Sequence, residues 1–87
     1  NVQFVLCMPF VLRCGAVGDH WFPEITDRQN IVRQIASDYN ATLIDFQTMF
    51  DQASQQAAPE YWAGDGVHPS LAGHMRMALT WFEAVKN

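Results

Sequence analysis

The sequence predicts an α/β fold with a parallel sheet, and two observations support this. Two short apolar runs of strand length occupy residues 2–9 and 41–46. A segment with helical spacing of apolar residues follows each run, so strands and helices alternate along the chain. Such alternation implies parallel strands joined by a right-handed crossover. At 87 residues, with no repeat and no internal linker, the chain is one small domain at most.

The first strand is expected over residues 2–9, whose sequence is almost continuously apolar. A run of this kind fits a strand that is covered on both faces of a parallel sheet. Residues 10–23 follow without a clean period and contain Gly15, Gly18 and Pro23. Long ordered connections in compact domains are often functional, so this loop is a candidate part of a site.

The first helix is expected over residues 26–39, because Thr26 and Gln29 have the spacing of a capping box. Its apolar residues fall on one helical face, which we expect to pack against the sheet. Asn40 then provides a C-terminal stop. The apolar face comprises Ile31, Val32, Ile35, Ala36 and Tyr39.

The second half of the chain predicts one more strand and two helices. The strand is expected over residues 41–46, and a weaker helix over residues 47–57 is ended by Pro59. The last helix, expected over residues 70–86, has the clearest pattern. One apolar stripe runs along it, formed by Leu71, Met75, Ala78, Leu79, Phe82 and Val85.

Two strands alone form too small a sheet, because both of their outer edges stay unpaired. We therefore expect another strand to pair with residues 2–9. It would come from an N-terminal segment that precedes Asn1 or from a second copy of the chain. An alternative is a non-catalytic fragment or interaction module that recruits a partner through this open strand edge.

Composition and charge exclude several classes of protein. The formal net charge is −4, the pI is near 5.0, and the five basic residues are scattered, which argues against a nucleic-acid-binding surface. No apolar stretch approaches the roughly 20 residues of a membrane-spanning helix. Cys7 and Cys14 show no CxxC spacing, so two buried or half-buried free thiols are favoured over a disulfide. The sequence does not indicate a compartment.

The strongest chemical signal is Asp65 followed three positions later by His68, which Pro69 then fixes. A carboxylate at this spacing holds one nitrogen of an imidazole, while the other nitrogen faces a nucleophile. The alternative is structural: Asp-Gly is a common turn pair, and proline often starts a helix. Tyr61 and Trp62 lie nearby in the sequence, and their side chains would line a pocket beside Asp65 and His68.

The segment YWAGDGVHPSLAGHMRMALTWF, residues 61–82, resembles the C-terminal block of the SGNH (GDSL-type) hydrolases. The shared pattern is Asp-x-x-His-Pro, then Ser or Thr, then an Ala-Gly-His helix start. Residues 4–12 and 31–46 resemble, in register, the family's late strand, the helix that follows and the next strand. The resemblance covers residues 1–87 as a single segment, which corresponds to the C-terminal part of the family domain.

The resemblance implies a flavodoxin-like, three-layer α/β/α fold. It also implies serine-dependent hydrolysis of small carboxylic acyl esters, with no metal and no cofactor; acetylated carbohydrates or short-chain esters are the expected substrates. By the motif match, His68 is the general base and Asp65 orients its imidazole. The family's nucleophile lies in an N-terminal Gly-Asp-Ser block that this chain lacks. We therefore expect the chain to be inactive by itself.

None of the serines is a good candidate for the nucleophile. Gly18-Asp19-His20 echoes the nucleophile block but has histidine in place of serine. Ser37 falls in a helix and Ser54 in a polar run. Ser70 is expected to cap the last helix.

The other histidines and the tryptophans have weaker signals. His74 is expected to be structural, and nothing in the sequence decides the role of His20. A zinc site made of Asp65 and all three histidines is a minor alternative, because their spacing fits no ligand signature. Trp81 is expected to pack within its helix. Trp21 and Trp62 are loop aromatics expected to contact an acyl or sugar group of the substrate.

Overall fold

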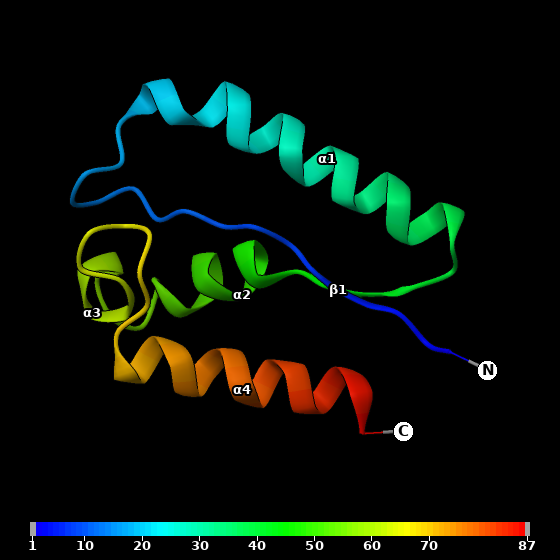
Figure 1. Cartoon of the computed structure of the whole chain (residues 1–87). Helices are drawn as coiled ribbons and strands as arrows, with labels where there is room; N and C mark the ends of the chain where they lie inside the picture. Colours follow the sequence, from blue (N-terminus) through cyan, green and yellow to red (C-terminus); the bar gives the residue numbers. More distant parts are fainter. Residues whose placement is uncertain (1, 87) are drawn as a thin grey trace.

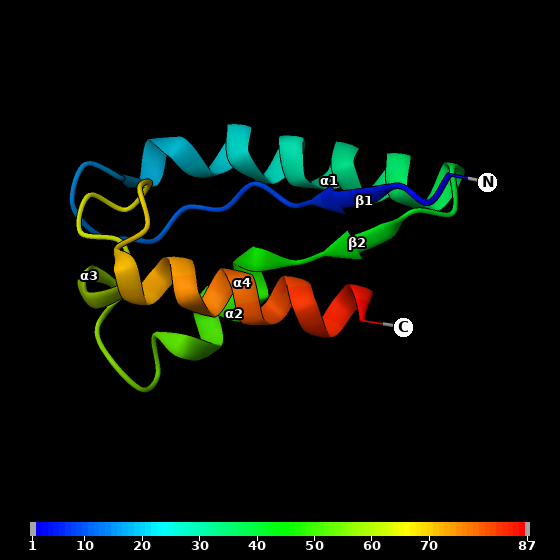
Figure 2. The ribbon, with the colours of Figure 1, turned by 60° about the horizontal axis from the view of Figure 1, so that its bottom comes forward.

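The computed structural model describes residues 2–86 and shows a parallel two-stranded sheet between two long helices (Figures 1 and 2). The helix α1 lies on one side of the sheet and α4 on the other. The elements are β1 (Val5–Cys7), the 3-10 helix η1 (Asp19–Trp21), α1 (Phe22–Asp38), β2 (Thr42–Ile44), α2 (Phe46–Ala53), α3 (Pro59–Trp62) and α4 (Leu71–Val85). The α/β class with parallel strands is as predicted.

Both strands are shorter than predicted. β1 and β2 pair in parallel over three residues each, with Leu6 opposite Leu43 at the centre of the register. The main chain adds one bond at each end, from the N–H of Met8 to Ile44 O and from the N–H of Thr42 to Phe4 O, both 2.9 Å. Beyond these bonds the first apolar run leaves the sheet, so the predicted strand of residues 2–9 was too long.

The helix α1 begins at Phe22, four residues before the predicted start. Pro23 lies in its first turn, where the missing N–H of proline costs no hydrogen bond. Thr26 is inside the helix, so the predicted capping box was wrong. The predicted burial of its apolar face was also wrong in part. The buried residues of this helix are Gln29 and Ala36. Three apolar residues of the predicted face are exposed instead: Ile31, Ile35 and Tyr39.

The helix α2 begins at Phe46 and ends at Ala53, four residues short of the predicted end. Asp45 caps it by accepting a hydrogen bond of 2.9 Å from the N–H of Thr48. The short helix α3, which Pro59 starts, was not predicted. A four-residue turn buries too few residues to give a periodic signal.

The helix α4 has nearly the predicted bounds. Ser70 caps it, because its Oγ accepts a hydrogen bond of 3.1 Å from the N–H of Gly73. Its packing differs from the prediction: the core side is Gly73 with Ala72 and Met77, and the apolar stripe faces outward. No helix within residues 2–86 is long and apolar enough to cross a membrane.

A hydrophobic core joins the loop after β1 to β2, α2 and α3. Phe50 lies at its centre and is fully buried, and the ring of Phe10 packs against it at a centroid distance of 4.6 Å. The buried cluster comprises Leu12, Ile44, Phe46, Phe50, Ala53, Trp62 and Ala63. The core includes Ala63, which directly precedes the loop that carries Asp65.

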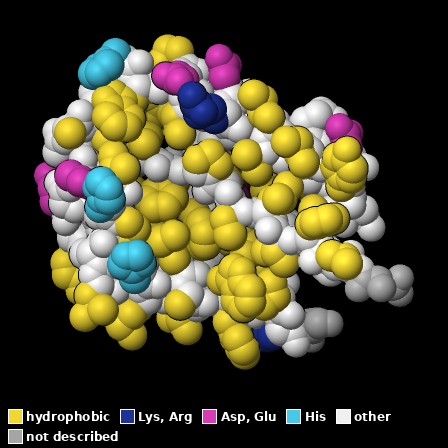
Figure 3. Space-filling model, in the orientation of Figure 1, with side chains coloured by type: hydrophobic (Ala, Val, Ile, Leu, Met, Phe, Trp, Pro, Cys, Tyr) yellow, Lys and Arg dark blue, Asp and Glu magenta, His cyan; other side chains and the backbone are white. Residues whose placement is uncertain are grey.

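On the β1 side, the chain leaves a broad hydrophobic surface uncovered. Phe4, Leu6, Ile35 and Tyr39 line one shallow hollow between β1 and α1. Figure 3 shows hydrophobic side chains gathered over the region where α1, β1 and α4 lie in Figure 1. We call this surface the open face. Its large residues, 42–79% exposed, are Phe4, Ile31, Ile35, Tyr39, Leu71, Met75, Leu79 and Phe82.

Candidate active site

The Asp65 side chain organises the loop that precedes α4. Its Oδ1 accepts hydrogen bonds from the N–H of Val67 at 2.8 Å and from the N–H of His68 at 2.7 Å. A short acidic side chain that binds the main chain two and three residues ahead folds the loop back on itself. The Asp-Gly turn, which was the structural alternative to a catalytic role for this motif, therefore also brings His68 back beside Asp65.

The second oxygen of Asp65 binds the imidazole. Asp65 Oδ2 lies 2.6 Å from His68 Nδ1, a distance typical of a strong, charge-assisted hydrogen bond. Both side chains reach solvent, at 47% exposed for Asp65 and 84% for His68. Because the carboxylate occupies Nδ1, Nε2 is the nitrogen left to face a reacting group. The structure thus brings together the two residues predicted to be catalytic.

Hydrogen bonds lower the pKa of Asp65 well below its ordinary range. The largest cause is the main-chain N–H of His68, followed by the imidazole and then the N–H of Val67. Each of these donors stabilises the charged carboxylate. Asp65 therefore remains an anion at any pH at which an ester hydrolase works, and it holds the His68 ring by its Nδ1–H.

Gly66 anchors this loop to the body of the protein. Its φ of 86° is left-handed, and the N–H of Leu12 donates to Gly66 O at 2.9 Å. A Cβ on Gly66 would lie 2.5 Å from Val17 Cγ2 and 2.6 Å from Cys14 O. Only glycine fits both the backbone angle and the space, so the Asp-Gly pair fixes where Asp65 lies.

The long loop after β1 holds Asp65 from the other side. The N–H of Ala16 donates to Asp65 O at 3.0 Å, and Gly15, with a φ of 58°, lies directly against the Asp65 main chain. Sequence reasoning marked residues 10–23 as a candidate functional loop, and these contacts make it the support of the Asp65 loop. The sequence analysis did not predict that Gly15 and Gly66 hold the Asp65 loop in position. For Gly66, the Asp-Gly turn pair was a signal that could have indicated this.

Trp62 lies in the core and not at the surface. Its side chain is only 6% exposed, and its indole N–H donates to Ala53 O at 3.1 Å. The main-chain oxygen of Trp62 accepts the N–H of Ser70 at 2.8 Å, which ties α3 to the start of α4. The structure therefore places Trp62 among the residues that support the loop, and its burial argues against the predicted contact with substrate.

Trp21 lines a surface hollow of about 480 Å³ with His20, Glu24 and Arg28 among its neighbours. The hollow is open and mixed in character, with an aromatic ring, a carboxylate and a guanidinium. Neither Asp65 nor His68 lines it. A contact between Trp21 and substrate therefore stays a prediction.

The remaining histidines are separate from the pair. His20 is exposed on η1, and His74 is exposed in the first turn of α4. Across residues 2–86, no three His, Cys, Asp or Glu side chains gather closely enough to hold a metal ion. The alternative zinc site is therefore not formed by these residues.

The three serines of the described residues make other contacts or lie exposed on other elements. Ser70 Oγ donates to Tyr61 O at 2.8 Å while it caps α4. Ser37 is exposed on α1, and Ser54 ends α2. In the described part of the chain, no serine is hydrogen-bonded to His68, so the pair has no nucleophile in contact.

Cys7 and Cys14 are not paired with each other; Cys14 is half-buried as expected, whereas Cys7 is exposed and not buried or half-buried as the sequence suggested. The Cys14 Sγ donates to Ala63 O at 3.1 Å, and burial raises the pKa of its thiol, with the nearby acids Glu60 and Asp65 adding to this effect. A thiol of raised pKa is a poor nucleophile. Cys14 is therefore a poor candidate for a nucleophile, and its bond to Ala63 O joins the loop after β1 to the end of α3.

Comparisons with known proteins agree with the sequence resemblance. No family model matches the chain. A curated acetylxylan esterase from Geobacillus stearothermophilus is 36% identical over 81 residues, which is 93% of this chain and 36% of the relative. The chain thus spans about a third of the length of this relative.

Solved structures give the same result. A protein from Parabacteroides merdae, described as a GDSL-like lipase, matches with a TM-score of 0.91 and 41% identity, over 97% of this chain and 39% of its own. The crystal structure of an acetylxylan esterase from Geobacillus stearothermophilus matches with a TM-score of 0.82 and 29% identity, over 98% of this chain and 38% of its own. Two variants of that enzyme, with a serine and with a histidine replaced by alanine, are described as catalytic mutants.

Proposed function

We propose that this chain, which is similar in sequence and fold to the C-terminal part of an SGNH (GDSL-type) hydrolase, carries the acid–base pair of a serine ester hydrolase. His68 is the general base and Asp65 is its orienting carboxylate. The main observation that supports this proposal is the 2.6 Å contact between Asp65 Oδ2 and His68 Nδ1, which leaves Nε2 free to bind a serine hydroxyl. The relatives are named as an esterase and a lipase, which supports ester hydrolysis.

The chemistry follows from this arrangement. His68 Nε2 takes the proton of a serine hydroxyl as the serine oxygen bonds to the ester carbonyl carbon. It then gives that proton to the alcohol oxygen as the carbon–oxygen bond to the alcohol breaks. A water molecule, deprotonated by the same nitrogen, then bonds to the acyl carbon; the acyl–serine bond breaks, the nitrogen returns the proton to the serine oxygen, and the acid is released. Asp65 remains a carboxylate throughout and stabilises the imidazolium that forms twice.

The serine is proposed to come from a segment outside residues 1–87. The edge of β1 that faces away from β2 has no strand partner in the described residues, and the open face extends beyond it on both helices. A parallel strand added beside β1 would lie between α1 and α4 and cover these side chains. The same addition would bring the serine-bearing end of a strand toward the Asp65 loop.

The proposed substrates are small esters of carboxylic acids, with acetylated carbohydrates first. The relatives named as acetylxylan esterases support this class. The exposure of His68 agrees with a site that accepts a soluble ester from solvent. Trp21 is proposed to contact the sugar or acyl group, since its ring lines an open hollow with polar neighbours.

A chimera tests the proposal. This chain would replace the equivalent C-terminal part of the Parabacteroides merdae protein, which it matches with a TM-score of 0.91. We expect the chimera to hydrolyse p-nitrophenyl acetate and the isolated chain to be inactive. His68→Ala in the chimera should lower kcat by roughly 10⁴-fold or more. His74→Ala, an exposed histidine six residues away on α4, should leave kcat unchanged.

Two outcomes would contradict the proposal. Turnover that survives His68→Ala would remove this residue from the mechanism, and hydrolysis by the isolated chain would show that residues 1–87 contain a nucleophile. A folded chimera with no activity on any ester would favour the alternative function, an interaction module. The open face is the observation that supports that alternative.

A further inference from the structure

We infer that Gln47, in the first turn of α2, is a positioning residue for the Asp65–His68 pair. Gln47 acts through the main chain of residues 10–12. Its side-chain amide makes the hydrogen bonds to this segment that a neighbouring strand would otherwise make. This inference rests on the proposed function of the pair. None of the contacts that carry it involves the side chains of Asp65 or His68.

Gln47 binds both main-chain groups of Val11. Its Nε2 donates to Val11 O at 2.9 Å, and its Oε1 accepts the N–H of Val11 at 3.0 Å. Main-chain groups that are buried must be paired, and Val11 is buried just where the chain has left the sheet. One side-chain amide thus supplies the two bonds that a paired strand would have supplied.

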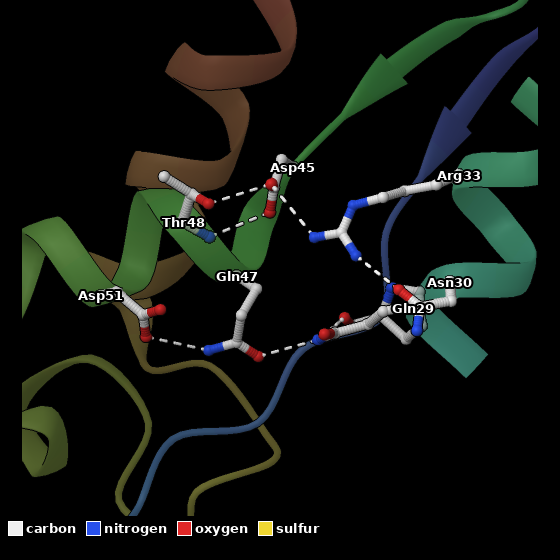
Figure 4. A network of polar contacts seen from close by, with 8 residues as sticks. Gln29, Asn30, Arg33, Asp45, Gln47, Thr48 and Asp51 are labelled. Carbon is white, nitrogen blue, oxygen red and sulfur yellow. Dashed lines mark hydrogen bonds and ion pairs between the residues drawn. The ribbon is translucent and has the colours of Figure 1, made fainter. Parts of the chain in front are cut away.

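A second glutamine fixes the orientation of the first (Figure 4). Gln29 Nε2, from α1, donates to Gln47 Oε1 at 3.1 Å and to Pro9 O at 2.9 Å. Gln47 Nε2 also donates to Asp51 Oδ1 at 3.0 Å, one turn along α2. Because the donors and acceptors alternate, neither amide can turn over without losing its bonds. The two helices therefore hold residues 9–11 from both sides.

The next residue transmits this constraint to the site. The N–H of Leu12 donates to Gly66 O at 2.9 Å, and Gly66 has no room for any side chain against Leu12 and Val17. Gly66 directly follows Asp65, so a shift of residues 11–12 moves the carboxylate. A displacement of about 1 Å at a reacting group lowers turnover severely.

Amide hydrogen exchange on the 87-residue chain tests the structural part of the inference. Gln47→Leu should raise the exchange rates of the Leu12, Val67 and His68 N–H groups. The N–H of Ala41, which donates to Ala36 O at the far end of α1, should keep its rate. Gln34→Leu is the matched control, because this exposed glutamine bonds only Asp38 within its own helix. Faster exchange at Val11 alone, or equally at every amide, would overturn the inference.

Kinetics of the chimera tests the functional part. In Gln47→Leu, kcat per titrated active site should fall about tenfold or more, with KM nearly unchanged, since the base is displaced and substrate contacts are not. In the His68→Ala background the same substitution should have no further effect. A purely structural role would lower the number of titrated sites and leave the turnover of each site intact, and that result would overturn the inference.

The two proposals fail in different ways. If His68→Ala stays active, the proposed function falls. If His68→Ala is inactive but Gln47→Leu turns over normally per site, only the positioning role of Gln47 falls.

Discussion

Asp65 combines two tasks that are commonly divided between residues. One oxygen folds the loop through the N–H groups of Val67 and His68, and the other holds the imidazole. The donors that fold the loop are also the ones that keep the carboxylate charged. The catalytic and the structural interpretations of the Asp-x-x-His spacing are therefore compatible, and the sequence alone could not show that one side chain satisfies both.

The low pKa of Asp65 predicts a pH dependence of stability. A group whose pKa is lower in the folded state stabilises the fold above its unfolded-state pKa, and this stabilisation is lost as pH falls. The difference in unfolding free energy between the chain and its Asp65→Ala variant should therefore be fully present above about pH 5. It should shrink as pH falls below the ordinary value near 3.8. Urea unfolding at several pH values measures this difference, and a gap that widens on acidification would contradict the account.

Gly66→Ala should be among the most damaging single changes in the loop. A residue with a side chain at a φ of 86° is strained by about 1–3 kcal/mol, and the added Cβ would also collide with Leu12 O. Thermal unfolding should show the loss. Gly64→Ala is the matched control, because its nearest heavy atom to a Cβ lies 4.0 Å away. Equal effects of the two substitutions would contradict the proposed anchoring.

At the scale of elements, α4 illustrates what sequence patterns predict well. Its start at Ser70 and its length followed from a capping residue and a sustained apolar period. The sequence pattern predicts that a helix forms and which of its faces is apolar. It does not predict which part of the molecule, if any, packs against that face. Leu71, Met75 and Leu79 are exposed here, whereas the small residues Ala72 and Gly73 pack inward.

Ser70→Ala should lower the unfolding free energy of the chain by about 1 kcal/mol. The substitution removes the cap on the N–H of Gly73 and the bond to Tyr61 O together. Chemical denaturation measures the change, and Ser37→Ala, at an exposed position of α1, should cost much less. A loss that is the same for both serines would show that the cap contributes nothing specific.

Elements with weak local signals were missed or misplaced for physical reasons. The helix α3 is a single turn, and η1 is shorter still, so neither has a period. The start of α1 shifted because Pro23 is favourable in a first turn, which outweighed the capping-box spacing of Thr26. The Gln47 contacts with Val11 join residues far apart in sequence and have no local signal.

For the whole molecule, the open face is the dominant feature. Large apolar side chains of α1 and α4 flank the unpaired edge of β1, and surfaces of this kind mark sites of association. The sequence predicted an unpaired strand edge from the small number of strands. The extent of the uncovered surface became apparent only when the two helices were placed.

The open face predicts self-association of the isolated chain. We expect the mass measured by analytical ultracentrifugation to rise with concentration, because water contacts many apolar side chains there. Met75→Lys with Leu79→Lys should shift the chain toward monomer. Gln52→Lys with Gln55→Lys, at two exposed polar positions that are not among the open-face residues, is the control and should not reduce association. A stable, folded monomer at all concentrations would contradict the need for a partner strand.

The central claim is that Asp65 holds the His68 ring so that Nε2 meets a serine hydroxyl. A crystal structure of the active chimera is the measurement that tests it most directly. The account predicts a serine Oγ within about 2.6–3.2 Å of His68 Nε2, with Nδ1 still bound to Asp65. A ring turned away from the carboxylate, or an Nε2 bonded to some other protein group while the enzyme is active, would contradict it.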